Sequence, residues 1–283
     1  MTTSNMRLII VTGLSGSGKS IVLRALEDAG FYCIDNLPAT LLPQISEHLA
    51  PATQQRVAIS IDTRSAALET LPENIQALRD KGISVQVLYL ESNAETLVKR
   101  FSETRRRHPL SDEKTTLAES IEYERQLLNR LVNLDHRIDT SNLSANTLRN
   151  WVRDFVVQQS TGMTLLFVSF GFKHGIPLDA DFVFDVRCLP NPHYDPVLRP
   201  LTGKDAPVQD FLRQQPMALE MLQDIRGYVE RWLPCFDGDH RSYLTVAIGC
   251  TGGQHRSVFF VEQLSQYFKD KQQKVLIRHR ELE

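Results

Sequence analysis

Residues Gly13 to Ser20 read G-L-S-G-S-G-K-S and match the phosphate-binding pattern G-x-x-x-x-G-K-[ST] at every position. The glycines let the backbone curl so that successive N–H groups face one anion. Lys19 can reach the β- and γ-phosphates, and the Ser20 hydroxyl can ligate Mg²⁺. The pattern therefore predicts a nucleoside triphosphate site formed by Gly13, Leu14, Ser15, Gly16, Ser17, Gly18, Lys19 and Ser20.

The sequence on either side of this loop predicts the elements that must position it. Residues 7–12 form a short apolar run that ends at a glycine, which is typical of a buried strand. Residues 19–28 predict a helix, whose positive dipole end would face the bound phosphates. Strand, loop and helix in this order favour a phosphate site over an ordinary Gly/Ser turn.

Two acidic residues follow predicted strands further along the chain. Asp62 follows an apolar strand at 57–61, as does the carboxylate that holds Mg²⁺ in many triphosphate sites. We therefore predict Asp62 and Ser20 as metal ligands, and Lys19 and Asp62 as the catalytic pair. Asp35 follows a short strand at 31–34, where small-molecule kinases often carry a carboxylate for the acceptor; the alternative is an Asx turn before Pro38.

A basic segment follows the strand expected at 85–90. A helix from Asn93 to about Arg107 would carry the cations Lys99, Arg100, Arg105, Arg106 and Arg107. Such arginines can form a lid that neutralises phosphoryl charge. A solvated basic face and an RNA contact are the alternatives.

The rest of the first half continues the alternation of strands and helices. Residues 117–134 have helical apolar spacing, residues 137–140 could be a last strand, and residues 148–157 a closing helix. The alternation predicts a parallel, three-layer α/β domain of the P-loop kinase-like type over residues 1–157. A polar bridge at 156–162 is a plausible boundary, followed by a second α/β domain over 163–283 with strands at 164–170, 182–186 and 243–249.

The second domain contains its own glycine loop, C-T-G-G-Q-H-R-S at 250–257, between an apolar strand and a helix expected at 258–268. Loop N–H groups, the helix dipole and an arginine could together bind a phosphate or a carboxylate. The irregular segment 189–200, rich in polar and aromatic residues, could complete the pocket. The predicted anion site, which we expect to take a sugar phosphate, comprises His174, His193, Arg199, Cys250, Thr251, Gly252, Gly253, His255 and Arg256.

Two other readings of this loop remain open. It could be a tight glycine turn beneath a helix. It also matches C-x-x-G-x-x-R-S, the loop of cysteine-dependent phosphatases, in which a thiolate attacks phosphorus. Gly249 stands where those enzymes usually carry histidine, and no companion acid is evident.

Composition limits the classes of function. The chain has 283 residues, 42% of them hydrophobic, and a net charge of −2, so nothing draws it as a whole to nucleic acid or to a membrane. Its four cysteines are scattered with no C-x-x-C pair, which argues against a zinc site and for reduced thiols. Residues 1–5 are a polar lead-in, and no apolar run is long enough to span a membrane. We expect a cytoplasmic protein.

These motifs together resemble one family, the bacterial RapZ/YvcJ nucleotide-binding proteins, which act as RNase adapters in enteric bacteria. The resemblance rests on residues 13–20, 31–38, 169–177, 184–192 and 247–257. It implies binding of ATP and GTP with weak hydrolysis, and a second nucleotide-contacting segment made of Asp62, Thr63, Arg64 and Ser65. It also implies that the C-terminal domain senses an amino-sugar phosphate and binds small regulatory RNA for a ribonuclease, in a homo-oligomer.

The C-terminal residues bear on the RNA role. Enteric members end in a strongly basic tail, whereas residues 269–283 here contain five Lys/Arg and three Asp/Glu, a net of +2. Each neutralised phosphate needs its own cation. The candidate RNA contacts are Lys269, Lys271, Lys274, Arg278 and Arg280. Besides this regulator, a P-loop small-molecule kinase that uses Asp35 and residues 100–107 remains open, as does the phosphatase.

Overall fold

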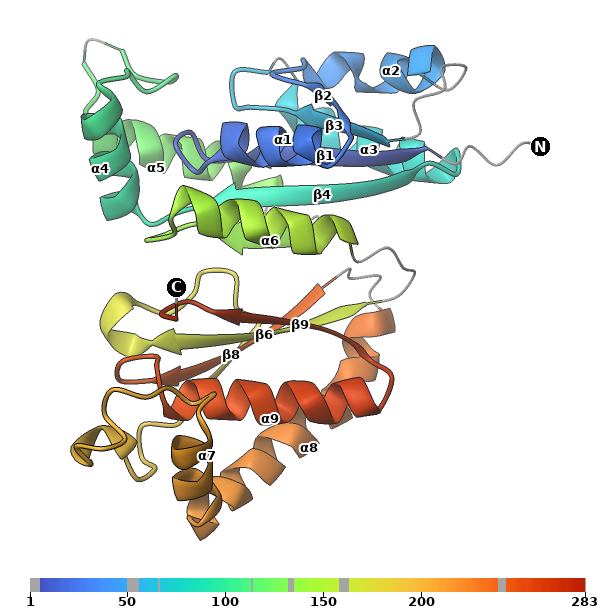
Figure 1. Ribbon diagram of the computed structural model, residues 1–283. Coiled ribbons are helices and arrows are strands. Elements are labelled where there is room, and N and C mark those ends of the chain that lie inside the picture. Colours follow the sequence, from blue (N-terminus) through green and yellow to red (C-terminus); the bar gives the residue numbers. More distant parts are fainter. Residues whose placement is uncertain are drawn as a thin grey trace. The chain divides into compact units, whose positions relative to one another are not determined.

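The computed structural model describes residues 6–49, 56–65, 67–112, 114–131, 135–157, 163–238 and 243–282. The chain divides into two compact units, residues 1–159 and 160–283 (Figure 1). The predicted lead-in at 1–5 and most of the predicted bridge at 156–162 lie outside the described residues. No helix within those ranges has the length and apolar character that a membrane crossing requires.

The N-terminal unit is built on a parallel sheet in the order β2-β3-β1-β4-β5. Its strands are β1 (Arg7–Gly13), β2 (Tyr32–Ile34), β3 (Arg56–Ser60), β4 (Ser84–Glu91) and β5 (His136–Asp139). Strand β1 lies at the centre, with Ile9 paired to Ala58 of β3 on one side and to Gln86 of β4 on the other. All carboxyl ends therefore meet at one edge, where parallel sheets bind ligands.

Helices cover both faces of this sheet, as the predicted three-layer fold requires. They are α1 (Lys19–Asp28), α2 (Leu42–Leu49), α3 (Leu71–Asp80), α4 (Ala94–Thr104), α5 (Leu117–Leu128) and α6 (Ala145–Val157). In Figure 1, α1 and α6 lie in front of the sheet, and α3 and α5 lie behind it. Alternate residues of β1 and β3, such as Leu8, Ile10 and Ile59, pack against Ile75 of α3 and Ile121 of α5. The predicted parallel α/β class is confirmed.

The C-terminal unit has a second parallel sheet, in the order β7-β8-β6-β9. Its elements are β6 (Thr164–Gly171), β7 (Phe182–Asp185), α7 (Ala206–Arg213), α8 (Pro216–Gly238), β8 (Tyr243–Cys250), α9 (Arg256–Asp270) and β9 (Lys274–His279). Helices α7, α8 and α9 cover one face, where Phe167, Val246 and Phe259 belong to the larger hydrophobic core. A smaller cluster around Phe170 fills the other face.

Several boundaries differ from those that the sequence predicts. Helix α4 ends at Thr104 rather than near Arg107, because Arg105 adopts a left-handed conformation with φ of 52° and terminates the helix. The helix expected over 117–134 ends at Leu128 and continues only as a 3₁₀ turn to Leu131. Helices α7 and α8 and strand β9 were not predicted. Strand β9 lies within the segment 269–283 that carries the candidate RNA contacts, and its Val275 and Ile277 pack against the core.

Candidate functional site

The phosphate loop has the predicted local geometry. Strand β1 delivers Gly13 into the loop, and α1 begins at Lys19 directly after Gly18, which has φ of 105°. Gly13 has φ of 126°, and a Cβ built on it would lie 1.9 Å from the Leu90 carbonyl oxygen of β4. Only glycine fits there, because the loop leaves β1 pressed against the neighbouring strand. The loop, the helix N-terminus and the sheet edge therefore coincide.

Lys19 folds back over this loop. Its Nζ donates to the carbonyl oxygens of Gly13 at 2.7 Å and of Leu14 at 3.1 Å. An ammonium group has three donors, so one remains for a phosphate oxygen. Burial lowers the pKa of Lys19, and the carboxylates of Glu124 and Asp62 offset this lowering only in part. An anion that enters the loop would favour the charged form of the lysine.

A cavity of about 710 Å³ opens above the loop. It is of the size that small-molecule sites commonly have. Its walls come from the phosphate loop, the end of β3, the α4 region and the start of α6. The lining residues include Ser15 to Ile21, Asp62, Arg64, Arg100, Arg106, Arg107, Thr140, Ser144 and Leu148.

Asp62 lies in this cavity at the carboxyl end of β3, as predicted. Arg64 donates to its Oδ2 from Nε at 3.0 Å and from a terminal nitrogen at 2.7 Å. The Asn36 amide, with its nitrogen turned toward Asp62, donates to both carboxylate oxygens at 3.1 Å. Asp62 and Ser20 thus line one cavity and offer the oxygen ligands that Mg²⁺ prefers.

The remaining members of the predicted 62–65 segment divide between the cavity and the surrounding structure. Arg64 lines the cavity. The Thr63 hydroxyl donates to Glu124 at 2.7 Å, and the Ser65 hydroxyl accepts from the Ala39 backbone N–H at 2.6 Å. Thr63 and Ser65 therefore position the segment rather than face the cavity. Asp35, the carboxylate of the kinase alternative, is not among the lining residues.

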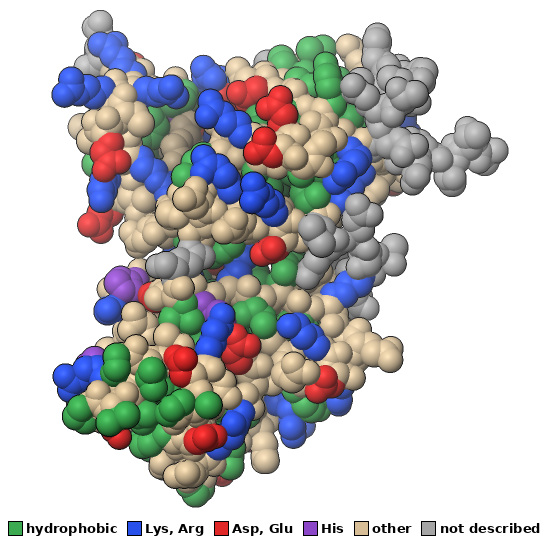
Figure 2. All heavy atoms as spheres, viewed as in Figure 1, with side chains coloured by type: hydrophobic (Ala, Val, Ile, Leu, Met, Phe, Trp, Pro, Cys, Tyr) green, Lys and Arg blue, Asp and Glu red, His purple; other side chains and the backbone are tan. Residues whose placement is uncertain are grey.

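The arginines of the predicted lid have two different roles. Arg100 donates to the Gly16 carbonyl oxygen at 3.0 Å and to the Thr140 carbonyl oxygen at 2.7 Å, so it braces the phosphate loop against the end of β5. Arg106 and Arg107, which follow α4, line the cavity. Figure 2 shows Lys and Arg side chains gathered over this part of the unit. Two guanidinium groups thus remain available to an anionic ligand.

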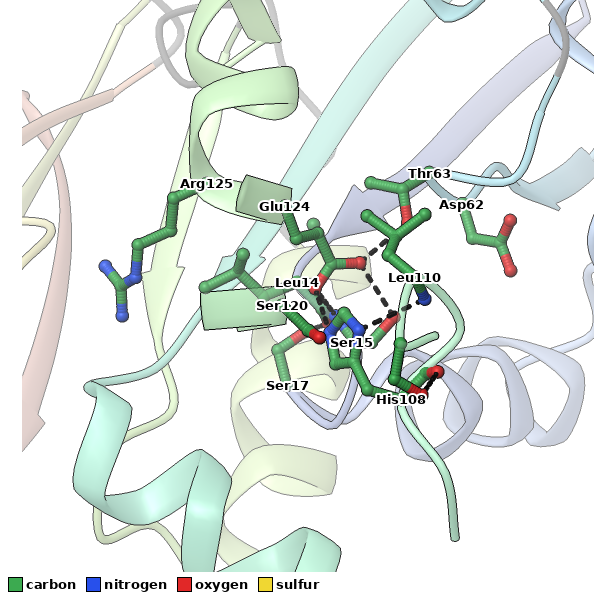
Figure 3. A network of polar contacts seen from close by, with 12 residues as sticks. Leu14, Ser15, Ser17, Asp62, Thr63, His108, Leu110, Ser120, Glu124 and Arg125 are labelled. Carbon is green, nitrogen blue, oxygen red and sulfur yellow. Dashed lines mark hydrogen bonds and ion pairs between the residues drawn. The ribbon is translucent and has the colours of Figure 1, made fainter. Parts of the chain in front are cut away.

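One carboxylate at the centre of this site was not predicted. Glu124 of α5 is completely buried, and its side chain reaches the underside of the phosphate loop (Figure 3). Its Oε2 accepts from the Ser15 N–H at 2.8 Å, and its Oε1 accepts from the Ser15 hydroxyl at 2.7 Å. Burial raises the pKa of Glu124, but hydrogen bonds from His108, Thr63 and Ser15 outweigh burial and lower it overall. The ionised carboxylate is the form that this network holds.

The C-terminal glycine loop uses its side chains differently. Arg256 is buried, and one terminal nitrogen donates to the carbonyl oxygens of Arg187 and Leu189, both at 2.8 Å. His255 is buried too, with Nε2 at 3.2 Å from the carbonyl oxygens of Leu198 and Arg199. Burial lowers the pKa of His255, which those carbonyl contacts only partly offset. Both side chains that were predicted to hold an anion hold the backbone of residues 187–199.

Cys250 is buried at the end of β8. Its Sγ lies 3.2 Å from the Ser257 hydroxyl and accepts from the Gly253 N–H at 3.2 Å. Cys250 is only 3% exposed, and because structural buried cysteines are inert, its burial does not support the phosphatase alternative. Gly253 has φ of 77°, and a Cβ there would meet the Glu281 carboxylate at 2.3 Å. An acidic side chain of this unit therefore already contacts the loop.

The other predicted anion contacts lie nearer the surface. His193 is exposed, its ring centroid lies 6.1 Å from that of His255, and its carbonyl oxygen accepts from Arg199 Nε at 3.1 Å. His174 is in the short 3₁₀ turn that follows β6. Figure 2 shows hydrophobic side chains gathered over the loop that contains His193, where Tyr194 and Val197 are 80% and 73% exposed.

The candidate RNA contacts do not form a tail. Lys269 and Lys271 lie at the end of α9, exposed, and Lys271 is ion-paired with Glu230. Lys274 begins β9, and the Arg280 N–H donates to the Ser169 carbonyl oxygen at 3.1 Å. Arg278 is only 4% exposed. The prediction that Arg278 contacts RNA from the surface is therefore corrected, because the strand turns its side chain into the protein.

Known proteins resemble the chain over both units. Residues 6–160 match the model of the RapZ-like N-terminal domain, and residues 163–283 match that of the RapZ C-terminal domain. A nucleotide-binding protein of Methylobacillus flagellatus is 68% identical over 278 residues, 98% of this chain and 99% of its own. One from Chromobacterium violaceum is 57% identical over the same shares of the two chains. Shikimate kinase from Acinetobacter baumannii, in complex with shikimate, is 17% identical with a TM-score of 0.40, over 56% of this chain and 97% of its own.

Proposed function

The chain belongs to the RapZ family, and from this premise we propose that its N-terminal unit binds a nucleoside triphosphate with Mg²⁺ in the cavity above the phosphate loop. The observation that carries the proposal is the position of Lys19, at the base of a cavity of about 710 Å³ at the carboxyl edge of a parallel sheet. The relatives described above, named nucleotide-binding proteins, support it.

Each residue has a distinct task in this proposal. The loop N–H groups and Lys19 bind the phosphates, and Arg106 and Arg107 neutralise their outer charge. Ser20 and Asp62 would hold Mg²⁺, which would supply positive charge to neutralise the phosphates. Asp62 accepts hydrogen bonds from Arg64, so the arginine fixes the direction of the carboxylate.

We further propose that ATP and GTP both bind and that hydrolysis is slow. Asp62 is the carboxylate among the residues that line the cavity, and it is engaged by Arg64 and assigned to the metal. No second acidic side chain among the described lining residues could orient an attacking water or take a proton from an acceptor. A regulator that binds and slowly turns over nucleotide fits this arrangement better than a small-molecule kinase does.

Calorimetric titration of the full chain with ATP and with GTP, with and without Mg²⁺, tests this function. We expect saturable binding of both, strengthened by Mg²⁺, with phosphate release that no added metabolite accelerates. Absence of binding by the folded protein would remove the proposal. Turnover stimulated by one phosphate acceptor would favour the kinase instead.

For the C-terminal unit, we propose the regulatory role of the family: sensing of an amino-sugar phosphate and binding of small RNA for a ribonuclease, in a cytoplasmic homo-oligomer. The support is local. The loop after β8 ends at the N-terminus of the 15-residue helix α9, and exposed His193 and Arg199 lie beside it. With Arg256 and His255 engaged by backbone carbonyls, the loop N–H groups and those two exposed side chains are the anion donors of this proposal.

RNA binding should be local and sensitive to salt. On single strands the slope of log affinity against log salt should be about −0.7 for each phosphate neutralised. Neutralising Lys269, Lys271, Lys274 and Arg280 should reduce both affinity and slope, whereas Arg278 is left intact because it is buried. Unchanged affinity and slope would place the RNA elsewhere.

Titration of the full chain with glucosamine phosphate tests the sensing role. If His193→Ala and Arg199→Ala leave the heat of binding unchanged, the loop that contains these two residues is not the sugar-phosphate site.

A further inference from the structure

Three segments that border the proposed nucleotide cavity meet at one buried carboxylate. Glu124 accepts hydrogen bonds from the phosphate loop through Ser15, from the segment after β3 through Thr63 at 2.7 Å, and from the segment after α4 through His108 Nε2 at 3.1 Å (Figure 3). The partners are 109, 61 and 16 residues away in sequence. The side chains of His108 and Glu124 are both fully buried. Nothing in the local sequence of α5 requires a carboxylate at this position.

The hydrogen bonds assign the roles of the two ring nitrogens of His108. The Leu110 N–H donates to His108 Nδ1 at 3.2 Å, so Nδ1 is the unprotonated acceptor and Nε2 carries the hydrogen. Nε2 therefore donates to Glu124. A carboxylate has about four lone-pair positions, and Ser15 with two donors, Thr63 and His108 fill all of them. Protein groups alone therefore satisfy this carboxylate.

Each of these partners adjoins a residue that faces the cavity. Ser15 belongs to the phosphate loop, Thr63 follows Asp62, and His108 follows Arg107. We infer that Glu124 is the positioning residue of the nucleotide site: it holds the phosphate loop, the metal carboxylate and the two cavity arginines at the spacing that a triphosphate requires. This inference rests on the proposed function. His108 is the part of the network that keeps Arg106 and Arg107 over the cavity.

The inference predicts a coupling that a purely structural role would not produce. In the wild-type protein, replacing Arg106 and Arg107 together by alanine should weaken Mg²⁺–ATP binding by about tenfold, since charge-assisted hydrogen bonds are lost. In a Glu124→Gln background the arginines are no longer held. The same pair of replacements should then weaken Mg²⁺–ATP binding by less than about twofold relative to Glu124→Gln alone. If Glu124 only stabilised the fold, the two losses in affinity would add.

Three variants make the test independent of folding. Glu122→Gln is the matched control, because Glu122 is on the same helix with an exposed side chain. His108→Asn keeps an acceptor near the Nδ1 position and loses the donor to Glu124, whereas His108→Gln places an N–H near the Nε2 position. We expect ATP to dissociate about tenfold faster from His108→Asn than from the wild type. In His108→Gln the dissociation rate should return to the wild-type value.

The measurement is stopped-flow release of a fluorescent ATP analogue from the full chain with Mg²⁺, after circular dichroism has shown each variant to be folded. If neither the wild type nor Glu122→Gln binds the analogue, the proposed function fails. If both bind, two results would overturn the positioning role. One is that the losses in affinity from Glu124→Gln and from the arginine replacements simply add, and the other is that His108→Asn and His108→Gln release the analogue at equal rates. Coupled losses together with rescue by His108→Gln support it, and the histidine variants decide the matter if Glu124→Gln does not fold.

Discussion

The loop after β1 and the loop after β8 both carry a parallel strand into the N-terminus of a helix, and both place a basic residue at the start of that helix. In the first, Lys19 donates hydrogen bonds to carbonyl oxygens of its own loop, at the wall of a large cavity. In the second, Arg256 reaches carbonyl oxygens of residues 187 and 189 and becomes part of the framework. The basic residue of the same local pattern thus lies at a cavity in one unit and holds the protein's own backbone in the other.

The difference depends on what supports each loop from outside. The first loop is braced by Arg100 from one side and by Glu124 from below, so its own lysine need not stabilise it. The second loop receives a backbone hydrogen bond from the Gly203 N–H to the Gln254 carbonyl oxygen at 2.9 Å, and its own His255 and Arg256 also fix it to residues 187–199. The two loops therefore differ in whether the basic residue at the start of the helix is itself part of the structural support.

Replacement of Lys19 tests the first half of this comparison and should have the largest effect. Lys19→Ala should weaken triphosphate binding by about a hundredfold or more, because a charge-assisted contact to phosphate is lost. The fold should remain, since the hydrogen bonds of the lysine are to its own loop. Calorimetry measures the affinity, with Arg24→Ala, an exposed cation on the same helix, as the control. Unchanged ATP affinity in a folded Lys19→Ala protein would falsify the role of the lysine.

Arg256 tests the second half. Arg256→Ala should lower the free energy of unfolding of the C-terminal unit by about 2–3 kcal/mol, because two carbonyl groups lose their charged donor. Trp232 lies in this unit, so its fluorescence in a Trp151→Phe background reports the unfolding by urea. Arg256→Lys should restore only part of the loss, since the shorter lysine cannot place its ammonium where the donating terminal nitrogen of Arg256 lies or also reach the Thr251 hydroxyl, which the second terminal nitrogen of Arg256 contacts at 3.4 Å. If Arg256→Ala left the free energy of unfolding unchanged but abolished anion binding, Arg256 would instead bind the anion directly, as is proposed for Lys19.

The contrast also explains how far the sequence predicts this protein. The phosphate loop could be predicted because its strand, glycines, lysine and helix are contiguous. Glu124 could not, because its partners come from as far as 109 residues away and α5 shows only an ordinary amphipathic pattern. The tasks of Arg256 and His255 were equally hidden, since the carbonyl groups that they hold lie 56 to 69 residues earlier. Strand β9 was missed because its basic residues suggested a tail, although Val275 and Ile277 alternate as in a half-buried strand.

Asp62 tests whether the first loop binds a metal together with the nucleotide. Asp62→Asn should weaken binding of Mg²⁺–ATP by about tenfold while metal-free ATP changes little, because an amide is a poorer ligand for a hard cation than a carboxylate. Titrations with Mg²⁺ and with EDTA measure the two affinities. Asp181→Asn, in the other unit, is the control for nonspecific effects. Equal losses under both conditions would remove Asp62 from the metal site.

Acidification tests the brace beneath the first loop. The pKa of Glu124 in the folded protein is below its ordinary value of 4.5, because hydrogen bonds to the ionised form outweigh burial. Its stabilising contribution is therefore present above about pH 4.5 and is lost as the pH falls through the folded-state pKa. Urea unfolding followed by Trp151 in a Trp232→Phe background should show stability falling less steeply below pH 5 in Glu124→Gln than in the parent. Parallel pH profiles would exclude this contribution.

Cys250 should give the smallest effect, and it sharpens the contrast between the loops. Its Sγ is buried and contacts the Ser257 hydroxyl and the Gly253 N–H, both at 3.2 Å, so serine can keep an acceptor for that N–H. Cys250→Ser should therefore cost the C-terminal unit about 1 kcal/mol or less, chiefly from replacing a small apolar atom by a hydroxyl.

The same variant should leave any binding of a sugar phosphate to the C-terminal unit within about twofold of wild type, because the sulfur faces Ser257 rather than a ligand. Calorimetry of the full chain measures this affinity, and release of phosphate from p-nitrophenyl phosphate measures any hydrolysis. Hydrolysis that is present in the wild type and lost in Cys250→Ser would mean that the loop opens to expose a reactive thiolate. Cys250 would then face a ligand, and its assignment to the framework of the C-terminal unit would fail.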